Sequence, residues 1–165
     1  HAKQIIAKLG DGSRYGVDIT YSFESGHPLG TGGGIRQALP FLEGGPFVLI
    51  SSDIWTDFDY RALQSDSSDV HLLMVPNPDY YPDGDYAIDH DGHLSLKGYK
   101  ATYGGIAILH PRLFAKEKAG KDFSLSPIIT EAIKRGSASG ELYQGQWYNV
   151  GTPEQLARVK LAHVV

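Results

Sequence analysis

Two segments that lie close together in the sequence hold residues whose types and spacing could do chemistry. The first runs from Pro28 to Gly34 and contains four glycines in five positions, 30 and 32–34. Glycines leave backbone N–H groups uncovered, so a flat or anionic ligand can approach the chain closely. The second is Ser51-Ser52-Asp53, in which a carboxylate follows a short apolar run. The two segments predict a nucleotide-binding site beside a metal-binding carboxylate. The alternative is a flexible glycine turn and a solvated Asp.

The elements around these segments must bring them to a ligand. Residues 34–39 are predicted to be helical, so the glycines would lead into a helix N-terminus, which favours anions. Residues 46–51 form a near-continuous apolar run, typical of a parallel strand that is covered on both faces. Such a strand would deliver Asp53 to its carboxyl end, where ligands bind in open α/β sheets.

Composition limits the class of protein. The chain has 165 residues, enough for one domain with a hydrophobic core, and we expect a single domain over residues 1–165. A net charge of −4 gives no reason to expect a nucleic-acid partner. The absence of cysteine excludes disulfides and thiolate chemistry and is consistent with a cytoplasmic protein. No apolar run approaches the roughly 20 residues that a membrane span needs.

Hydrophobic periodicity and turn residues predict an α/β fold with a mostly parallel sheet and a small β excursion. We expect helices at 2–9, 34–39, 59–63, 127–135 and 153–162, and strands at 17–23, 46–51, 70–75, 86–88, 93–96, 103–109, 141–143 and 146–150. Without a further strand beside it, the strand at 47–50 would present an open apolar edge. His90 and His93 flank Asp91-Gly92, which favours a surface turn over a metal site.

An ordered series of motifs resembles the sugar-1-phosphate nucleotidyltransferases. The motifs are Leu29-Gly30-Thr31-Gly32-Gly33-Gly34, Ser52-Asp53-Ile54, Gly104-Gly105-Ile106 and Trp147-Tyr148-Asn149-Val150-Gly151-Thr152-Pro153. They extend over nearly the whole chain in the right order. The resemblance is closest to the N-acetylmuramate 1-phosphate uridylyltransferases, which recycle a cell-wall sugar, and mannose-1-phosphate guanylyltransferases follow.

The resemblance implies a Rossmann-like, GT-A-like fold and a Mg²⁺-dependent reaction. An NTP, with UTP favoured, and a sugar 1-phosphate would give an NDP-sugar and pyrophosphate by in-line attack on the α-phosphorus, without a covalent enzyme intermediate. Asp53 would be the catalytic metal ligand, and Asn149 would return to the same metal. Gly105 and Asp85 would face the sugar. The base and ribose would be held by Leu29, Gly30, Thr31, Gly32 and Gly33.

Each implied role has a structural alternative. Asp53 could cap Thr56 or a neighbouring N–H group. Asn149 could be a turn residue before Gly151, and Asp85 could be a solvated hairpin carboxylate. These alternatives stay open at the level of the sequence.

Two departures from the family pattern matter. Asn149 stands where the family has Asp, so one charge at the metal is missing. The family also begins with a strand and a Gly-rich loop bearing an Arg and, later, a Lys, which this sequence lacks. About two strand–helix units of about 30 residues each would precede this chain, which would then form the C-terminal two thirds to three quarters of the domain. Because the retained part otherwise keeps the family pattern, a fragment is favoured over a degenerate relative. The remaining alternatives for the function are a mannose-1-phosphate guanylyltransferase, a glucose-1-phosphate thymidylyltransferase and a non-catalytic nucleotide-sugar binding domain.

Overall fold

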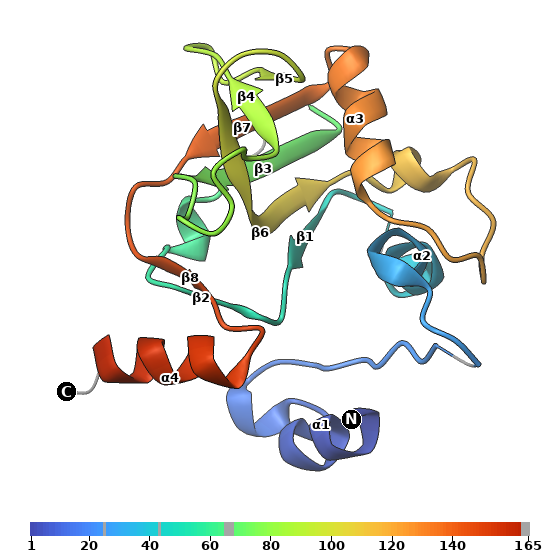
Figure 1. Cartoon of the computed structure of the whole chain (residues 1–165). Helices are drawn as coiled ribbons and strands as arrows, with labels where there is room; N and C mark the ends of the chain where they lie inside the picture. The colour runs from blue at the N-terminus through green and yellow to red at the C-terminus, as the bar shows by residue number, and fades with distance from the viewer. Residues whose placement is uncertain (25, 43, 65–67, 163–165) are drawn as a thin grey trace. The chain divides into compact units, whose positions relative to one another are not determined.

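The computed structural model describes residues 1–24, 26–42, 44–64 and 68–162 of the chain (Figure 1). The chain divides into two compact units. The first unit comprises His1–Glu43 and Glu117–Leu125, and the second comprises Gly44–Lys116 and Ser126–Val165. The single domain expected from the sequence stays a prediction.

The first unit is helical. It contains α1 (Ala2–Leu9), the 3₁₀ turn η1 (Ser13–Tyr15), α2 (Gly30–Ala38) and the 3₁₀ turn η2 (Leu39–Phe41). The predicted bounds of α1 are confirmed. The helix ends at Gly10, whose φ of +63° suits a residue without a Cβ.

The strand predicted at 17–23 is wrong, because this segment forms no ladder in the described part of the chain. It is extended and crosses the first unit, with the Ile19 N–H donating to the Asp11 carbonyl at 2.8 Å. Val17 and Phe23 are 54% and 59% exposed. An alternating sequence makes a strand only where a neighbouring strand supplies hydrogen bonds and a surface to cover one face.

The glycine segment is a helix and not a loop. α2 begins at Gly30, four residues before the predicted start, so the glycines form its first turns. The segment that ends at Leu125 passes directly against them: the Gly33 N–H donates to the Phe123 carbonyl at 3.2 Å. A methyl group added at Gly32 would lie 2.4 Å from the Phe123 ring, and one at Gly33 would lie 2.3 Å from the Lys121 carbonyl oxygen. The glycines therefore permit close packing within the first unit.

The second unit is built on a mixed sheet. Its strands are β1 (Phe47–Ile50), β3 (Val70–Val75), β4 (Tyr86–Ile88), β5 (Leu94–Ser95), β6 (Lys100–Leu109) and β7 (Ala138–Leu142). The order is β5-β4-β6-β3-β7, and β1 pairs with β6. The turns η3 (Tyr60–Ala62) and η4 (Pro111–Phe114) connect strands, η3 replacing the helix predicted at 59–63.

The α/β class is confirmed, but the prediction of mostly parallel strands is wrong. Among the described strands only β3 and β7 pair in parallel. β1 runs antiparallel to β6 with Phe47 opposite Leu109, and its Val48 and Ile50 are 52% and 48% exposed. The prediction that the run at 46–51 is a parallel strand covered on both faces is therefore wrong. In the described part of the chain, its second edge pairs with no strand, which agrees with the expected open edge.

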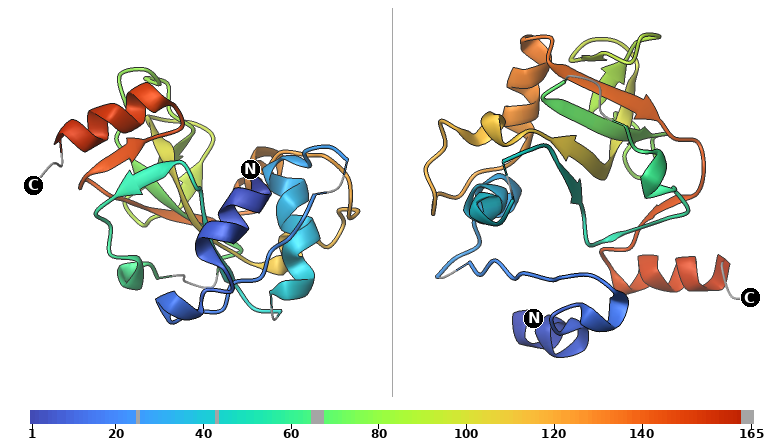
Figure 2. Two further views of the ribbon diagram at one scale, coloured as in Figure 1. Left: turned by 90° about the horizontal axis from the view of Figure 1, so that it is seen from below. Right: turned by 180° about the vertical axis from the view of Figure 1, so that it is seen from behind.

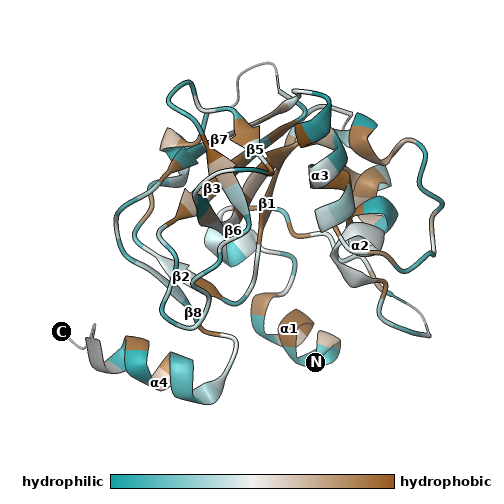
Figure 3. Ribbon diagram, turned by 45° about the horizontal axis from the view of Figure 1, so that its top comes forward, coloured by the Kyte–Doolittle hydropathy of each residue, from teal (hydrophilic) through white to brown (hydrophobic). Residues whose placement is uncertain are grey.

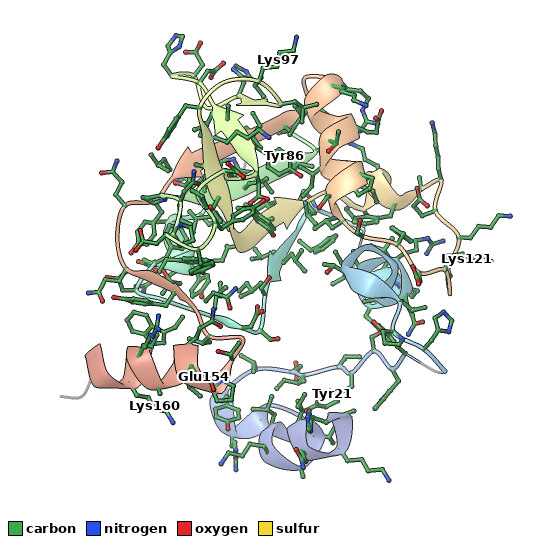
Figure 4. The ribbon with its side chains drawn as sticks, viewed as in Figure 1. Tyr21, Tyr86, Lys97, Lys121, Glu154 and Lys160 are labelled. Atoms are coloured by element: carbon green, nitrogen blue, oxygen red, sulfur yellow. The ribbon has the colours of Figure 1, made fainter. Side chains whose placement is uncertain are left out.

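The core of the second unit lies around β3 and β6. Every residue of β3 is buried, and Figure 3 shows hydrophobic colour concentrated on these strands and hydrophilic colour on the loops around them. The helix α3 (Ser126–Lys134) adds Ile129, Ala132 and Ile133 to the core. Tyr86 of β4 points into this packed region in Figure 4, and its burial raises the pKa of its hydroxyl.

The C-terminal part of the second unit is a two-stranded ladder followed by a helix. β2 (Ile54–Thr56) pairs antiparallel with β8 (Trp147–Asn149), and α4 (Pro153–Ala162) follows β8, as both views in Figure 2 show. Thr152 caps α4: its Oγ1 accepts from the Gln155 N–H at 3.2 Å, and Gln155 Oε1 accepts from the Thr152 N–H at 2.9 Å. This reciprocal capping box fixes the first turn. Among the described residues, no helix has the length and apolar character needed to cross a bilayer.

Candidate active site

The β2–β8 ladder brings Asp53 and Asn149 together, although 95 residues separate them in the chain. Ile54 lies opposite Asn149 in the ladder, so Asp53 lies at the point where the ladder ends. The Val150 N–H donates to the Asp53 backbone carbonyl at 2.7 Å and extends the pairing by one step. The relative position of the two residues is therefore set by backbone hydrogen bonds.

The side-chain oxygens of these two residues lie next to one position, Gly151. A methyl group added at Gly151 would lie 3.1 Å from Asn149 Oδ1 and 3.4 Å from Asp53 Oδ2. Asn149 Oδ1 accepts from the Gly151 N–H at 2.9 Å, which orients the amide. A carbonyl oxygen has a second lone pair, so this bond leaves it able to bind a cation.

This donor set suits Mg²⁺. The ion prefers hard oxygen ligands and usually takes one or two from the protein, leaving its other positions to phosphate oxygens and water. Asp53 is exposed, and its carboxylate makes no ion pair within the described ranges. The metal role of Asp53 and Asn149 stays a prediction that this arrangement supports, and the turn bond of Asn149 is compatible with it.

Asp53 and Asn149 share a cavity of about 320 Å³ with Gly105. The complete lining is Ser51, Asp53, Ile54, Pro78, Tyr80, Tyr81, Thr102, Tyr103, Gly105, Trp147 and Asn149. Gly105 has a φ of +76°, and a methyl group there would lie 2.9 Å from Ser51 Oγ. Only glycine therefore lets β6 pass this close to the end of β1. The structure thus brings together three of the residues that the sequence assigned to metal and sugar.

Asp85 has a different position. It does not line this cavity. Its carboxylate accepts from the Tyr81 hydroxyl at 3.0 Å and from the Tyr103 N–H at 2.8 Å. The hydrogen bond with Asp85 raises the pKa of the Tyr81 hydroxyl. Because Tyr81 and Tyr103 both line the cavity, the contacts of Asp85 are those of a residue that positions its wall; a direct contact with sugar stays a prediction.

Leu29 and the glycines after it lie in the other unit. Leu29 is buried, and its N–H donates to Glu24 Oε2 at 2.8 Å. Gly30, Thr31, Gly32 and Gly33 form the first turns of α2. Their assignment to base and ribose stays a prediction, and the contacts with Phe123 and Lys121 supply a packing reason for the glycines that the sequence could not reveal.

Sequence reasoning missed Arg158. Together with Gln155 it reaches from α4 into a second cavity of about 630 Å³, which borders on the first. A positively charged side chain on an amphipathic helix normally lies on the solvated face. No signal in the sequence therefore distinguishes Arg158 from an ordinary surface residue. Tyr80 lines both cavities, and Tyr81 lines the first one.

Three side chains of types that can bind metal ions lie together in the turn between β4 and β5, and their hydrogen bonds give them a structural role. Asp89, Asp91 and His93 lie close together and are all exposed. Asp89 Oδ1 accepts from the Asp91 N–H at 3.0 Å and from the His93 N–H at 2.9 Å. These bonds close the β4–β5 turn, which agrees with the surface turn predicted for this segment.

The chain is similar to curated enzymes. No family model matches it. It is 38% identical over 159 residues to the N-acetylmuramate alpha-1-phosphate uridylyltransferase of Neisseria meningitidis, a match that covers 91% of this chain and 69% of that protein. It is 27% identical over 145 residues to the D-glycero-alpha-D-manno-heptose 1-phosphate guanylyltransferase of Campylobacter jejuni, covering 84% of this chain and 65% of that protein.

Solved structures share the fold. The crystal structure of HddC from Yersinia pseudotuberculosis complexed with GMP-PN has a TM-score of 0.74 at 24% identity, covering 99% of this chain and 75% of that chain. A putative glucose-1-phosphate thymidylyltransferase from Bacillus anthracis, in complex with a sucrose, has a TM-score of 0.76 at 17% identity, with 98% and 72% covered. At these identities the likeness concerns the fold, and it confirms the predicted α/β class.

Proposed function

This chain belongs to the sugar-1-phosphate nucleotidyltransferase family, and we propose that the protein transfers a uridylyl group from UTP to N-acetylmuramate 1-phosphate. The products are UDP-N-acetylmuramate and pyrophosphate. The similarity to the Neisseria protein over 91% of the chain supports this pair of substrates. Because the chain covers 69% of that relative, the proposal concerns the protein to which this chain belongs.

The observation that carries the proposal is the junction of Asp53 and Asn149 in one cavity with Gly105. Transfer of a nucleotidyl group needs the sugar phosphate in line with the α-phosphorus and neutralisation of phosphate charge. When bound, Mg²⁺ supplies that neutralisation, and Asp53 and Asn149 are the residues that would hold it. Gly105 leaves room on the β6 side of the cavity for the acceptor. No residue is needed as a covalent nucleophile.

The neutral amide of Asn149 has a consequence for the metal. A carboxylate at this position would add a full charge, whereas the amide contributes only a dipole. We therefore expect the protein to need a higher Mg²⁺ concentration than it would with two acidic ligands.

For the nucleotide, we propose that the first turn of α2 contacts base and ribose through its backbone. Helix first turns carry N–H groups that lack an intrahelical acceptor. The Leu29 N–H donates to Glu24, and the Gly33 N–H donates to Phe123. This proposal therefore concentrates on Gly30, Thr31 and Gly32.

Two alternatives have specific support. A guanylyltransferase is supported by the similarity to the Campylobacter protein, whose name describes that reaction. A non-catalytic nucleotide-sugar binding domain is motivated by Asn149, because the site lacks one of the expected charges.

The decisive experiment measures pyrophosphate release by the full-length gene product. UTP, GTP and dTTP are each paired with N-acetylmuramate, mannose and glucose 1-phosphates, with and without Mg²⁺. We expect the highest kcat/KM with UTP and N-acetylmuramate 1-phosphate. Without Mg²⁺ we expect no pyrophosphate release. Preference for GTP would support the guanylyltransferase instead. If the protein binds an NDP-sugar but turns over no pair of NTP and sugar 1-phosphate, the non-catalytic nucleotide-sugar binding domain is supported.

A further inference from the structure

The second cavity continues the first one away from Asp53. It has a volume of about 630 Å³ and shares Pro78, Tyr80, Trp147 and Asn149 with the Asp53 cavity. Its far wall comes from α4, where Gln155, Arg158 and Val159 line it. These positions are spaced i, i+3 and i+4, so they lie on one face of the helix. A ligand with its phosphate near Asp53 therefore has a built space into which the rest of it can extend.

Arg158 is the cation among the described residues that line the two cavities. Asp53 lines the first and Asp79 lines the second. Within the described ranges Arg158 makes no ion pair, whereas Arg61 pairs with Asp59 at 2.9 Å. The carboxylate of Asp79 repels an anion in the same cavity. A ligand carboxylate would therefore bind there favourably only if it contacts the Arg158 guanidinium.

The boundary between the cavities is aromatic. Trp147 Nε1 donates to the Gly104 carbonyl at 2.8 Å, which fixes the indole ring against β6. Tyr80 is 62% exposed and lines both spaces. Aromatic faces with a polar edge suit the apolar face of a sugar ring.

We propose that Arg158 recognises the lactyl carboxylate of N-acetylmuramate 1-phosphate and thereby sets the sugar specificity. This inference rests on the proposed function, because N-acetylmuramate differs from N-acetylglucosamine by a lactyl ether that carries one carboxylate. The phosphate lies in the Asp53 cavity, the ring crosses the boundary at Tyr80 and Trp147, and the carboxylate meets Arg158. The planar guanidinium matches a carboxylate with two parallel hydrogen bonds.

The chain offers a matched control on the same helix. Lys160 is exposed and lies two positions from Arg158, and residues spaced i, i+2 do not share a helix face. Figure 4 shows its side chain directed outward from α4. Arg158→Gln and Lys160→Gln each remove one positive charge from α4, but only the first changes the cavity wall.

The test uses the full-length protein and compares these variants, together with Arg158→Lys, by steady-state kinetics. We expect Arg158→Gln to raise the KM for N-acetylmuramate 1-phosphate by about 10- to 100-fold, the size of a lost charge-assisted hydrogen bond, with kcat and the KM for UTP little changed. The preference for N-acetylmuramate over N-acetylglucosamine 1-phosphate should fall by the same factor. Arg158→Lys should raise the KM for N-acetylmuramate 1-phosphate less than Arg158→Gln does. Lys160→Gln should have the wild-type KM. Thermal unfolding of all four proteins verifies that they are folded.

The results separate the two proposals. If wild type uses N-acetylmuramate 1-phosphate and Arg158→Gln has the same KM as Lys160→Gln, the role of Arg158 is refuted while the proposed function stands. The role is also refuted if Arg158→Gln lowers activity equally with both sugar phosphates. If wild type does not use N-acetylmuramate 1-phosphate at all, the proposed function fails and this inference fails with it.

Discussion

Replacement of Gly33 by alanine tests whether packing requires the glycines of α2. In an exposed helix interior, alanine in place of glycine raises the free energy of unfolding by about 1 kcal/mol. At Gly33 the added methyl would lie 2.3 Å from the Lys121 carbonyl oxygen and 2.9 Å from Leu29 Cβ. A backbone oxygen cannot move out of the way by a change of rotamer, so the segment that ends at Leu125 must shift.

The expected magnitude follows from two opposing terms. Overpacking costs about 1–3 kcal/mol, and a contact this short with backbone belongs at the upper end. Subtracting about 1 kcal/mol of helix propensity leaves a net loss of about 2 kcal/mol for Gly33→Ala. Gly34→Ala is the matched control, because its methyl meets only Glu24 Oε1, at 2.8 Å, at the end of a side chain whose other oxygen accepts from the Leu29 N–H. A gain of about 1 kcal/mol in helix propensity is offset by a loss of about 1 kcal/mol if that hydrogen bond is weakened, so the stability of this variant should stay within about 1 kcal/mol of wild type.

Urea unfolding measures the difference. With a slope of about 2 kcal/mol per molar urea, the midpoint of Gly33→Ala should fall by about 1 M, and that of Gly34→Ala should stay within about 0.5 M of the wild-type midpoint. Equal midpoints for the two variants would refute the packing explanation. If Gly33→Ala kept its stability and instead lost affinity for UTP, the glycines would be explained by a ligand.

Three further predictions concern the second unit. Asp53→Asn should lower kcat at saturating Mg²⁺ by about 100-fold or more, measured by pyrophosphate release from the full-length protein, and a fully active variant would remove Asp53 from the metal site. Asn149→Asp should lower the Mg²⁺ concentration for half-maximal rate or leave it unchanged; a requirement for more Mg²⁺ would contradict a shared metal. The Tyr103 hydroxyl is buried without a hydrogen-bond partner among the described residues. Tyr103→Phe should therefore leave the free energy of unfolding unchanged or raise it by up to about 1 kcal/mol, measured by urea unfolding. A clear loss of stability would mean that the hydroxyl has a partner.

Elements with strong local signals could be predicted from the sequence. α1 has glycine at its end, β3 is a continuous apolar run, and α4 has Thr152 and Pro153 at its start; the bounds of all three were predicted as the structure has them. In each of these the local preference and the tertiary surroundings agree.

The failures come from positions where a partner distant in sequence decides. The segment at 17–23 alternates like a strand but has no ladder beside it. The glycines read as a loop because helix propensity disfavours them, yet the segment around Phe123 needs a surface without side chains. β1 is apolar in sequence, but pairing with β6 alone leaves its alternate residues half exposed. None of these partners is visible within a window of neighbouring residues.

In the candidate site, too, some residues could be predicted from the sequence and others depend on the fold. The junction of Asp53 and Asn149 could be foreseen from the motif order, because the segment at 147–152 was expected to return to the metal. The structure adds that the junction is held by backbone bonds of the β2–β8 ladder and not by the two side chains. A change from amide to carboxylate at 149 therefore alters charge while the ladder preserves geometry, which makes Asn149→Asp a test of electrostatics alone. Arg158 could not be foreseen, because its position depends on how the capped first turn of α4 directs one face of the helix into a cavity, and that is a property of the fold rather than of any motif.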